Sequence, residues 1–267
     1  MKIHPTAIVD ADAEIDPTAE IGAFTVVEAG VRIGPDCIIE SHCRIYRGTH
    51  MGARNRVSFS VALGGPPQDL THNAHADTFL EIGDDNVFRE FCSVHRATEK
   101  DDGVTRIGSK SFFMGDTHVG HDCKVGNNVV LSHGASLSGH CRIDDQARLG
   151  GYCGLHQHVR VGQYAMIGGM AAVVQDVPPF ALAVGNPARY LGLNQVGLRR
   201  AEFSRERRSA IRAAYKLLYG TGRPRAEVLA ELLASADTDH QSIAEFFQSS
   251  RRGVMAAGRR GNDSDES

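Results

Sequence analysis

Histidine is the residue type most suggestive of chemistry in this chain of 267 residues, which contains 13 of them. The stretch from residue 118 to residue 158 holds six, which are His118, His121, His133, His140, His156 and His158. Asp122 follows His121 directly, and a carboxylate beside an imidazole suits a general base because it fixes the tautomer and steadies the imidazolium. A solvated polar face is the alternative for any single histidine, and the clustering favours a site.

The six cysteines raise three other kinds of chemistry, which are disulfides, a metal site and a nucleophile. They are Cys37, Cys43, Cys92, Cys123, Cys141 and Cys153. All of them fall at one position of a six-residue repeat, where a small side chain is expected to face inward and buried cysteine serves as a small hydrophobe. We therefore predict that the cysteines are core residues and that the chain holds no metal.

The six-residue repeat supplies the elements that must position these side chains. A large apolar residue recurs every six positions over residues 3–63, 82–94 and 107–173, and the residue two positions earlier is mostly small. Residues two apart in a strand face the same way, so each repeat predicts a short strand with both side chains inward. Glycine often follows the apolar residue and marks a corner, where a positive φ or a close backbone approach is expected.

A period of six with three strands to a coil is typical of a triangular parallel β-helix. The predicted fold is therefore mainly β, a parallel β-helix of about ten coils over residues 1–187. Left-handed coils are expected from the resemblance to other hexapeptide-repeat proteins. A prism filled by stacked aliphatic side chains has no room for tryptophan, which agrees with 6% aromatic residues and no Trp.

Two interruptions of the repeat predict loops that project from the coils, at residues 64–79 and 95–105. Long loops on a rigid scaffold are frequent functional sites. After Pro178 and Pro179 the pattern becomes helical, and residues 188–255 are predicted to form a small α-helical C-terminal domain with Ser204 as a helix cap. Residues 256–267 are predicted to be a disordered tail.

Charge and hydropathy exclude several function classes. A net charge of −3 argues against a nucleic-acid-binding protein. No run approaches the ~18 apolar residues that span a bilayer, so no membrane insertion is expected. The N-terminus has no apolar signal-peptide core, and we expect a cytoplasmic protein.

Several motifs resemble one family of acyltransferases. They are GGPPQDL, VHR, HVGHDCKVG, SGHCRIDDQARLGG, LHQHVRVG, VQDVPPF, GNPAR and NQVGLRRAEFSRE. Together they cover roughly residues 3–255 and resemble the UDP-N-acetylglucosamine 3-O-acyltransferases that begin lipid A biosynthesis. The resemblance implies a homotrimer with active sites between neighbouring β-helices. It also implies transfer of an (R)-3-hydroxyacyl group from acyl carrier protein to the sugar 3-hydroxyl.

The resemblance also assigns roles to residues of this chain. His121 is the expected general base, Asp122 orients it, and the backbone N–H of Gly139 serves the oxyanion. Nine further residues are expected to bind substrate. Gln68 and Asp69 are expected at the sugar, and Asn194 and Arg200 at the nucleotide. Gly169 is expected at the acyl chain, and the cleft is expected to be lined by His118, His140, Gly151 and Gln157. No cofactor is implied, because the donor carries its own phosphopantetheine arm.

Three positions depart from the family pattern. Thr71 stands where a lysine that faces the phosphate or the sugar is expected after Gln68-Asp69-Leu70. Val196 replaces an expected acidic residue, and Ala201 replaces the second arginine of the nucleotide pair, although Arg199 is available. These departures leave open whether the acceptor is a 3-hydroxyl or a 3-amino sugar, and the acyl length is open as well.

The charge of the C-terminal part gives independent support for the donor. Residues 188–255 contain 12 Lys and Arg against 7 Asp and Glu. A basic patch beside a cleft would steer a small acidic carrier protein, whereas an ordinary helical surface is the alternative.

Three other functions compete with this interpretation. A hexapeptide acetyltransferase that uses acetyl-CoA can share the GNPAR motif, but the long loop at 64–79 and the helical tail weigh against it. A trimeric β-helix carbonic anhydrase would use His118 and His121 as zinc ligands, and the adjacent Asp122 fits the acyltransferase motif better. A non-enzymatic scaffold does not account for the outward histidines.

Overall fold

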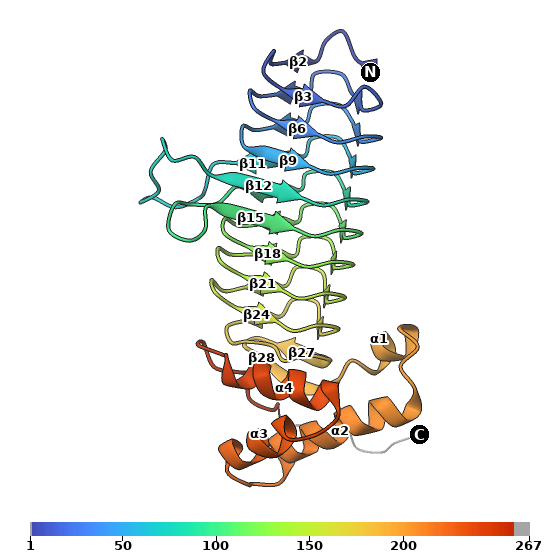
Figure 1. The fold of residues 1–267 in the computed structure, drawn as a ribbon, viewed down its shortest axis with the longest axis vertical. Coiled ribbons are helices and arrows are strands. Elements are labelled where there is room, and N and C mark those ends of the chain that lie inside the picture. The colour runs from blue at the N-terminus through green and yellow to red at the C-terminus, as the bar shows by residue number, and fades with distance from the viewer. Residues whose placement is uncertain (1, 259–267) are drawn as a thin grey trace.

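Each repeat of the sequence forms a short strand followed by a tight corner, and successive corners turn the chain into a triangular prism. The computed structural model describes residues 2–258, and Figure 1 shows these as a stack of coils with four helices at the C-terminal end. The chain crosses the front face of the stack from left to right as it descends in Figure 1, so the coils are left-handed. The predicted left-handed parallel β-helix is confirmed.

Within residues 2–258 the strands form three sheets, one on each face of the prism, which we call sheets A, B and C. Sheet A contains β1 (Lys2–Ile3), β4 (Glu20–Ile21), β7 (Ile38–Ile39), β10 (Arg56–Val57), β13 (Val87–Phe88), β16 (Phe112–Phe113), β19 (Val130–Leu131), β22 (Arg148–Leu149), β25 (Met166–Ile167), β27 (Ala181–Gly185) and β28 (Ala188–Leu193). Sheet B contains β2 (Ile8–Val9), β5 (Val26–Val27), β8 (Arg44–Ile45), β11 (Ala62–Gly65), β14 (Ser93–His95), β17 (His118–Val119), β20 (Ser136–Leu137), β23 (Gly154–Leu155) and β26 (Ala172–Val173). Sheet C contains β3 (Glu14–Ile15), β6 (Arg32–Ile33), β9 (Thr49–Met51), β12 (Phe79–Ile82), β15 (Val104–Ile107), β18 (Lys124–Val125), β21 (Arg142–Ile143) and β24 (Arg160–Val161).

The core of the prism consists of the side chains that the repeat places inward. From Ile21 to Val173 every large apolar position of the repeat is buried, and stacked strands pair in parallel register, for example Val119 with Leu137. All six cysteines are buried and free, as predicted. Burial raises the pKa of the Cys43 thiol to about 11 and that of Cys153 to about 12, so these thiols stay protonated and behave as small apolar groups.

The corner glycines serve close backbone approach more often than a positive φ. A Cβ at Gly22 would lie 2.6 Å from the backbone carbon of Glu40 in the next coil. The left-handed backbone lies two residues further along, where Phe24 has a φ of 57°. The same arrangement recurs at Gly120, with a φ of 59° at Asp122.

Both predicted loops leave the corner that joins sheet B to sheet C. The first loop, residues 66–78, connects β11 to β12, and the second loop, residues 96–103, connects β14 to β15. They project together from one side of the prism in Figure 1. Any residue in the lower B–C corners therefore lies beneath both loops.

The helices pack against the C-terminal end of the prism. They are α1 (Gln195–Arg200), α2 (Arg205–Gly220), α3 (Arg225–Leu233) and α4 (Thr238–Gln248), and α2 begins after Ser204, whose side chain accepts from the N–H of Arg207 as expected of a cap. The strand β28 pairs antiparallel with β27 and extends sheet A beyond the predicted domain boundary at residue 187.

In the predicted tail, Gly258 donates to the carbonyl of Tyr190, and residues 259–267 lie outside the described part of the chain. Among the described residues no helix is long and apolar enough to cross a membrane.

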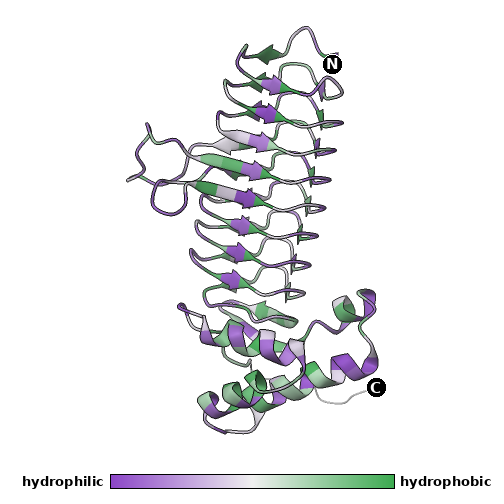
Figure 2. Cartoon of the chain, viewed as in Figure 1, coloured by the Kyte–Doolittle hydropathy of each residue, from purple (hydrophilic) through white to green (hydrophobic). Residues whose placement is uncertain are grey.

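The three outer faces of the prism differ in polarity. Sheet C presents a ladder of charged and polar side chains, seen as the purple front strands in Figure 2 and including Arg32, Arg106 and Arg142. Sheet A presents mostly apolar side chains from β13 onward, and sheet B presents mostly small ones from β14 onward, with Ser136 and Gly154 among them and His118 as the exception. Sheet C is therefore the face best suited to solvent.

Candidate active site

His121 lies in the B–C corner between β17 and β18 and is 5% exposed. Its Nδ1 lies 2.7 Å from Oδ2 of Asp122. Asp122 is buried in the left-handed corner conformation, which turns its carboxylate back toward the preceding residue. A histidine whose Nδ1–H is directed to a carboxylate keeps the lone pair of Nε2 free to take a proton.

The second loop completes the environment of Asp122. The backbone N–H of Thr98 donates to Oδ1 over 3.1 Å, and its hydroxyl donates to Oδ2 over 2.8 Å. The backbone N–H of Asp122 donates in turn to Oγ1 of Thr105. Burial raises the pKa of the Asp122 carboxyl, but the hydrogen bonds from His121 and Thr98 outweigh it and hold that pKa below its ordinary value. Asp122 is therefore an ionised acceptor that fixes the imidazole in place.

Gly139 lies one coil below His121 and touches the imidazole. A Cβ at this position would lie 2.6 Å from Cε1 and 2.7 Å from Nε2 of His121. Within residues 2–258 the backbone N–H of Gly139 donates to no acceptor, while its carbonyl accepts from the N–H of His158. A backbone N–H without an acceptor, on a residue that packs against an imidazole, is free to donate to an oxyanion.

Two further predicted histidines surround this pair. Nδ1 of His118 lies 2.8 Å from the hydroxyl of Ser93, and burial, with a smaller contribution from His121, lowers the His118 pKa. His140 crosses His121 nearly at right angles with ring centroids 5.2 Å apart, and its Nε2 lies 3.6 Å from Asp122. Burial also lowers the pKa of His140 although Asp122 opposes it, so both rings are neutral polar groups near pH 7.

The two loops are joined by a lysine that the sequence pattern did not identify. Nζ of Lys100, in the second loop, lies 2.6 Å from Oδ2 of Asp69 and also contacts the hydroxyl of Thr71. The cation expected at position 71 of the first loop is thus supplied from the second loop. The pairing could be anticipated only from the fact that both interruptions leave the same corner of the repeat.

The remaining predicted site residues do not gather around His121. Gln157 is exposed in the same B–C column, directly before His158. Gly151 and Gly169 stack at the corner between sheets A and B, where a Cβ at Gly169 would lie 3.3 Å from the carbonyl oxygen of Gly151. The exposed Gln68 belongs to the first loop.

Asn194 and Arg200 flank α1 on the side of sheet A. The side chain of Asn194 accepts from the N–H of Gly197 over 3.0 Å and donates to the carbonyl of Tyr164 over 2.9 Å, so it caps the helix. One chain therefore presents the imidazole groups at the B–C corner and the residues expected at the nucleotide on a different face.

One group among the described residues brings three potential metal ligands together, namely His121, Asp122 and His140, whose ligand atoms lie within 4.8 Å of one another. Both carboxylate oxygens of Asp122 already accept hydrogen bonds from Thr98, and one also faces Nδ1 of His121. The donors are thus used in a hydrogen-bonded pair, which is the arrangement of an acid–base site.

Comparisons with known proteins identify the family. Residues 176–255 match the model described as UDP-N-acetylglucosamine O-acyltransferase, domain 2, and residues 12–47 match the bacterial transferase hexapeptide with six repeats. A relative from Burkholderia vietnamiensis, named acyl-(acyl-carrier-protein)–UDP-N-acetylglucosamine O-acyltransferase, is 45% identical over 260 residues, which cover 95% of this chain and 99% of the relative. The chain belongs to this family.

Other members of the O-acyltransferase family agree over the whole length. A relative of the same name from Syntrophobacter fumaroxidans is 43% identical over 96% of this chain and 100% of its own. The solved UDP-N-acetylglucosamine acyltransferase of Francisella novicida superposes with a TM-score of 0.94 at 34% identity, over 96% of this chain and 95% of that one. The chain is therefore an acyltransferase, and the scaffold and carbonic anhydrase alternatives are wrong.

Proposed function

We propose that this O-acyltransferase moves an (R)-3-hydroxyacyl group from acyl carrier protein to the 3-hydroxyl of UDP-N-acetylglucosamine, as the first step of lipid A biosynthesis in the cytoplasm. The observation that carries the mechanism is the buried pair of His121 and Asp122, with Gly139 packed against the imidazole and its backbone N–H without an acceptor among the described residues. Family membership supports the donor and the acceptor.

The proposed reaction uses these three groups in turn. Nε2 of His121 takes the proton of the sugar hydroxyl as its oxygen attacks the thioester carbonyl, and a C–O bond forms. The N–H of Gly139 donates to the oxyanion of the tetrahedral intermediate. The C–S bond then breaks, and the imidazolium returns the proton to the phosphopantetheine thiolate. Asp122 stabilises the imidazolium throughout, and no cofactor or metal takes part.

A homotrimer would complete the site. The B–C corner with His121 and the α1 side with Arg200 lie on different faces of one prism, so a substrate that contacts both needs a second subunit. The A–B corner carries exposed apolar side chains, which are Phe24, Phe59, Phe91, Tyr152 and Met170. Exposed apolar ridges mark interfaces, and a cyclic trimer that packs sheets A and B together leaves the charged sheet C in water.

The donor and the acyl length belong to the same proposal. The positive excess of residues 188–255 would attract the acidic acyl carrier protein to the C-terminal end of the prism. Gly169, exposed and without a side chain, would leave room for a long acyl chain at the A–B corner.

The test is a transfer assay with the purified protein, several (R)-3-hydroxyacyl-carrier and acetyl-CoA donors, and UDP-sugars that carry a 3-hydroxyl or a 3-amino group. We expect turnover with the hydroxyacyl carrier and the 3-hydroxyl sugar, and loss of turnover in His121→Ala with an unchanged thermal transition. Light scattering should give a mass three times that of one chain. Exclusive use of acetyl-CoA, or of the 3-amino sugar, would replace the proposal with that activity, and one zinc per subunit by metal analysis would contradict the mechanism.

A further inference from the structure

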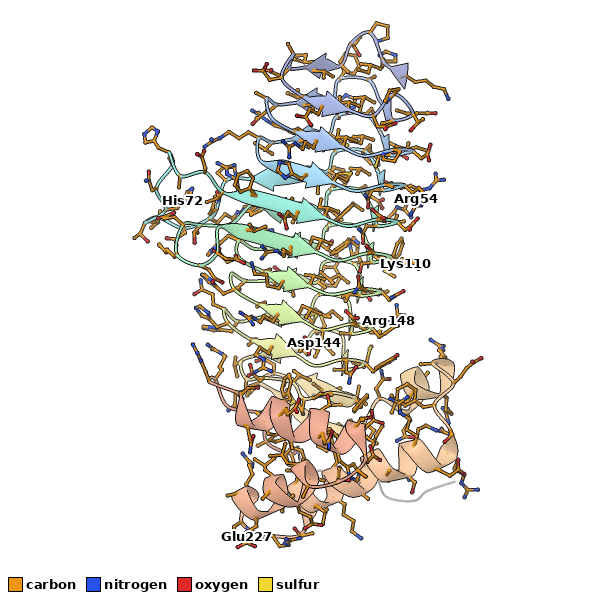
Figure 3. All side chains as sticks on the ribbon, in the orientation of Figure 1. Arg54, His72, Lys110, Asp144, Arg148 and Glu227 are labelled. Carbon is orange, nitrogen blue, oxygen red and sulfur yellow. The ribbon has the colours of Figure 1, made fainter. Side chains whose placement is uncertain are left out.

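A cavity of about 860 Å³ lies between the outer face of sheet A and α1. Its wall on the sheet includes Arg148 of β22 and Met166 of β25, and its wall on the helix includes Val196, Arg200 and Ala201. Residues far apart in the sequence thus share one space, on the side of the prism opposite the loop that bears His72 in Figure 3.

Arg148 is a charged residue between two apolar neighbours on sheet A. It pairs in register with Val130 in the coil before and with Met166 in the coil after, and both are apolar and face outward with it. Arg148 reaches solvent, and partial burial between these apolar side chains lowers the pKa of its guanidinium. An apolar residue would fit this position in the stripe at no such cost, so packing alone does not account for the arginine.

The charges of the cavity point to an anion. Arg148 and Arg200 are the charged residues that line it, no carboxylate does, and within residues 2–258 neither arginine forms an ion pair. The positive charge of Arg200 lowers the pKa of Arg148 further, so the two repel each other. Some arginines on other coils are paired, as Arg54 is with Asp85, whereas the two arginines here share one cavity without a carboxylate. Both guanidinium groups reach solvent, and two unpaired positive charges beside one acid-free cavity attract an anion placed between them.

We propose that Arg148 binds the diphosphate of the UDP-sugar together with Arg200, and so supplies the second cation that Ala201 lacks. The inference rests on the proposed function, in which the diphosphate is the charged part of the acceptor. Guanidinium groups match phosphate oxygens with paired N–H donors, and two of them bracket a dianion better than one. Because Arg148 lies on β22, the sequence around α1 does not show this second cation.

The test compares Arg148→Met with Arg142→Met, both in the full-length protein. Methionine repeats the residue at 166, so Arg148→Met should fold, and its melting temperature and mass in solution verify this. Arg142 lies outward on β21 of sheet C with no ion pair among the described residues and serves as the matched control. We expect a 10- to 100-fold rise in the Kd for UDP by calorimetry and a similar rise in the KM for the UDP-sugar. We expect little change in kcat, partial recovery in Arg148→Lys, and no effect of Arg142→Met.

Uridine, which lacks phosphate, separates the diphosphate from the base. Its binding should be equal in the wild type and in Arg148→Met. An equal loss of UDP and uridine binding would assign Arg148 to the base and overturn the inference, as would an unchanged Kd for UDP. If the wild type binds UDP in this way but transfers no acyl group, the proposed function fails and the anion site stands. If transfer proceeds and Arg148→Met leaves the KM unchanged, only this inference fails.

Discussion

Replacement of Gly139 by alanine tests how tightly the corner holds the general base. The new Cβ would lie 2.6 Å from Cε1 of His121, whereas carbon atoms in contact stay about 3.6 Å apart, so the ring must move by about 1 Å. Gly139 has no positive φ, so alanine introduces no backbone strain of its own. The backbone N–H is kept, and the oxyanion donor with it. The substitution therefore acts on the position of the imidazole.

A displacement of about 1 Å at a catalytic group lowers the rate about 100-fold. We expect kcat to fall by that factor, equivalent to about 2.7 kcal/mol of activation free energy, while the KM for the UDP-sugar stays within about threefold. The assay is steady-state transfer from hydroxyacyl carrier protein, with the thermal transition and the mass in solution measured alongside. Gly220→Ala at the end of α2 is the control, because its Cβ would lie 3.6 Å from Lys216, an ordinary contact.

A double variant distinguishes the imidazole from other routes. If Gly139→Ala acts only by moving His121, it should cause no further loss in the His121→Ala background. A kcat for Gly139→Ala within about threefold of the wild type would refute the geometry that we describe. A large further loss in the double variant would show that alanine also disturbs the oxyanion or the substrate.

Three other predictions follow from the loops, a partly buried histidine and the acyl corner. Lys100→Met should raise the KM for the UDP-sugar severalfold. The free energy of unfolding should change by less than about 1 kcal/mol, because the ion pair with Asp69 is solvent-exposed. An unchanged KM would contradict the role of Lys100. Burial lowers the pKa of His95 from 6.5 to about 4, so between these values the unfolded chain binds a proton that the folded chain does not. The free energy of unfolding should therefore fall as the pH drops through this window, by at most about 3 kcal/mol, and His95→Gln should flatten the dependence in denaturant titrations at fixed protein concentration. Gly169→Met should shift the preferred donor to a shorter acyl chain in competition assays, at about fourfold in kcat/KM for each methylene that no longer fits, and an unchanged preference would exclude this corner from the acyl site.

Much of the fold was predictable because the repeat has a strict register. Large apolar and small residues alternate on the inward side of every strand, which determined the parallel coils and the burial of the cysteines, Cys123 and Cys141 among them. The adjacency of His121 and Asp122 is likewise local, since neighbouring residues at a tight corner need no distant contact to meet. The sequence alone did not determine whether the corner glycines serve a positive φ or a close approach, because that depends on the coil stacked below.

The tertiary structure decided which distant residues share a site. Thr98 reaches Asp122, and Lys100 reaches Asp69, because both loops leave the same corner of the stack. Arg148 meets Arg200 because α1 folds back over sheet A. A periodic pattern specifies which side chains face inward along each strand, since that depends on neighbours in the chain. The partners of outward side chains depend on how loops and helices pack onto the prism, and the repeat does not specify that packing.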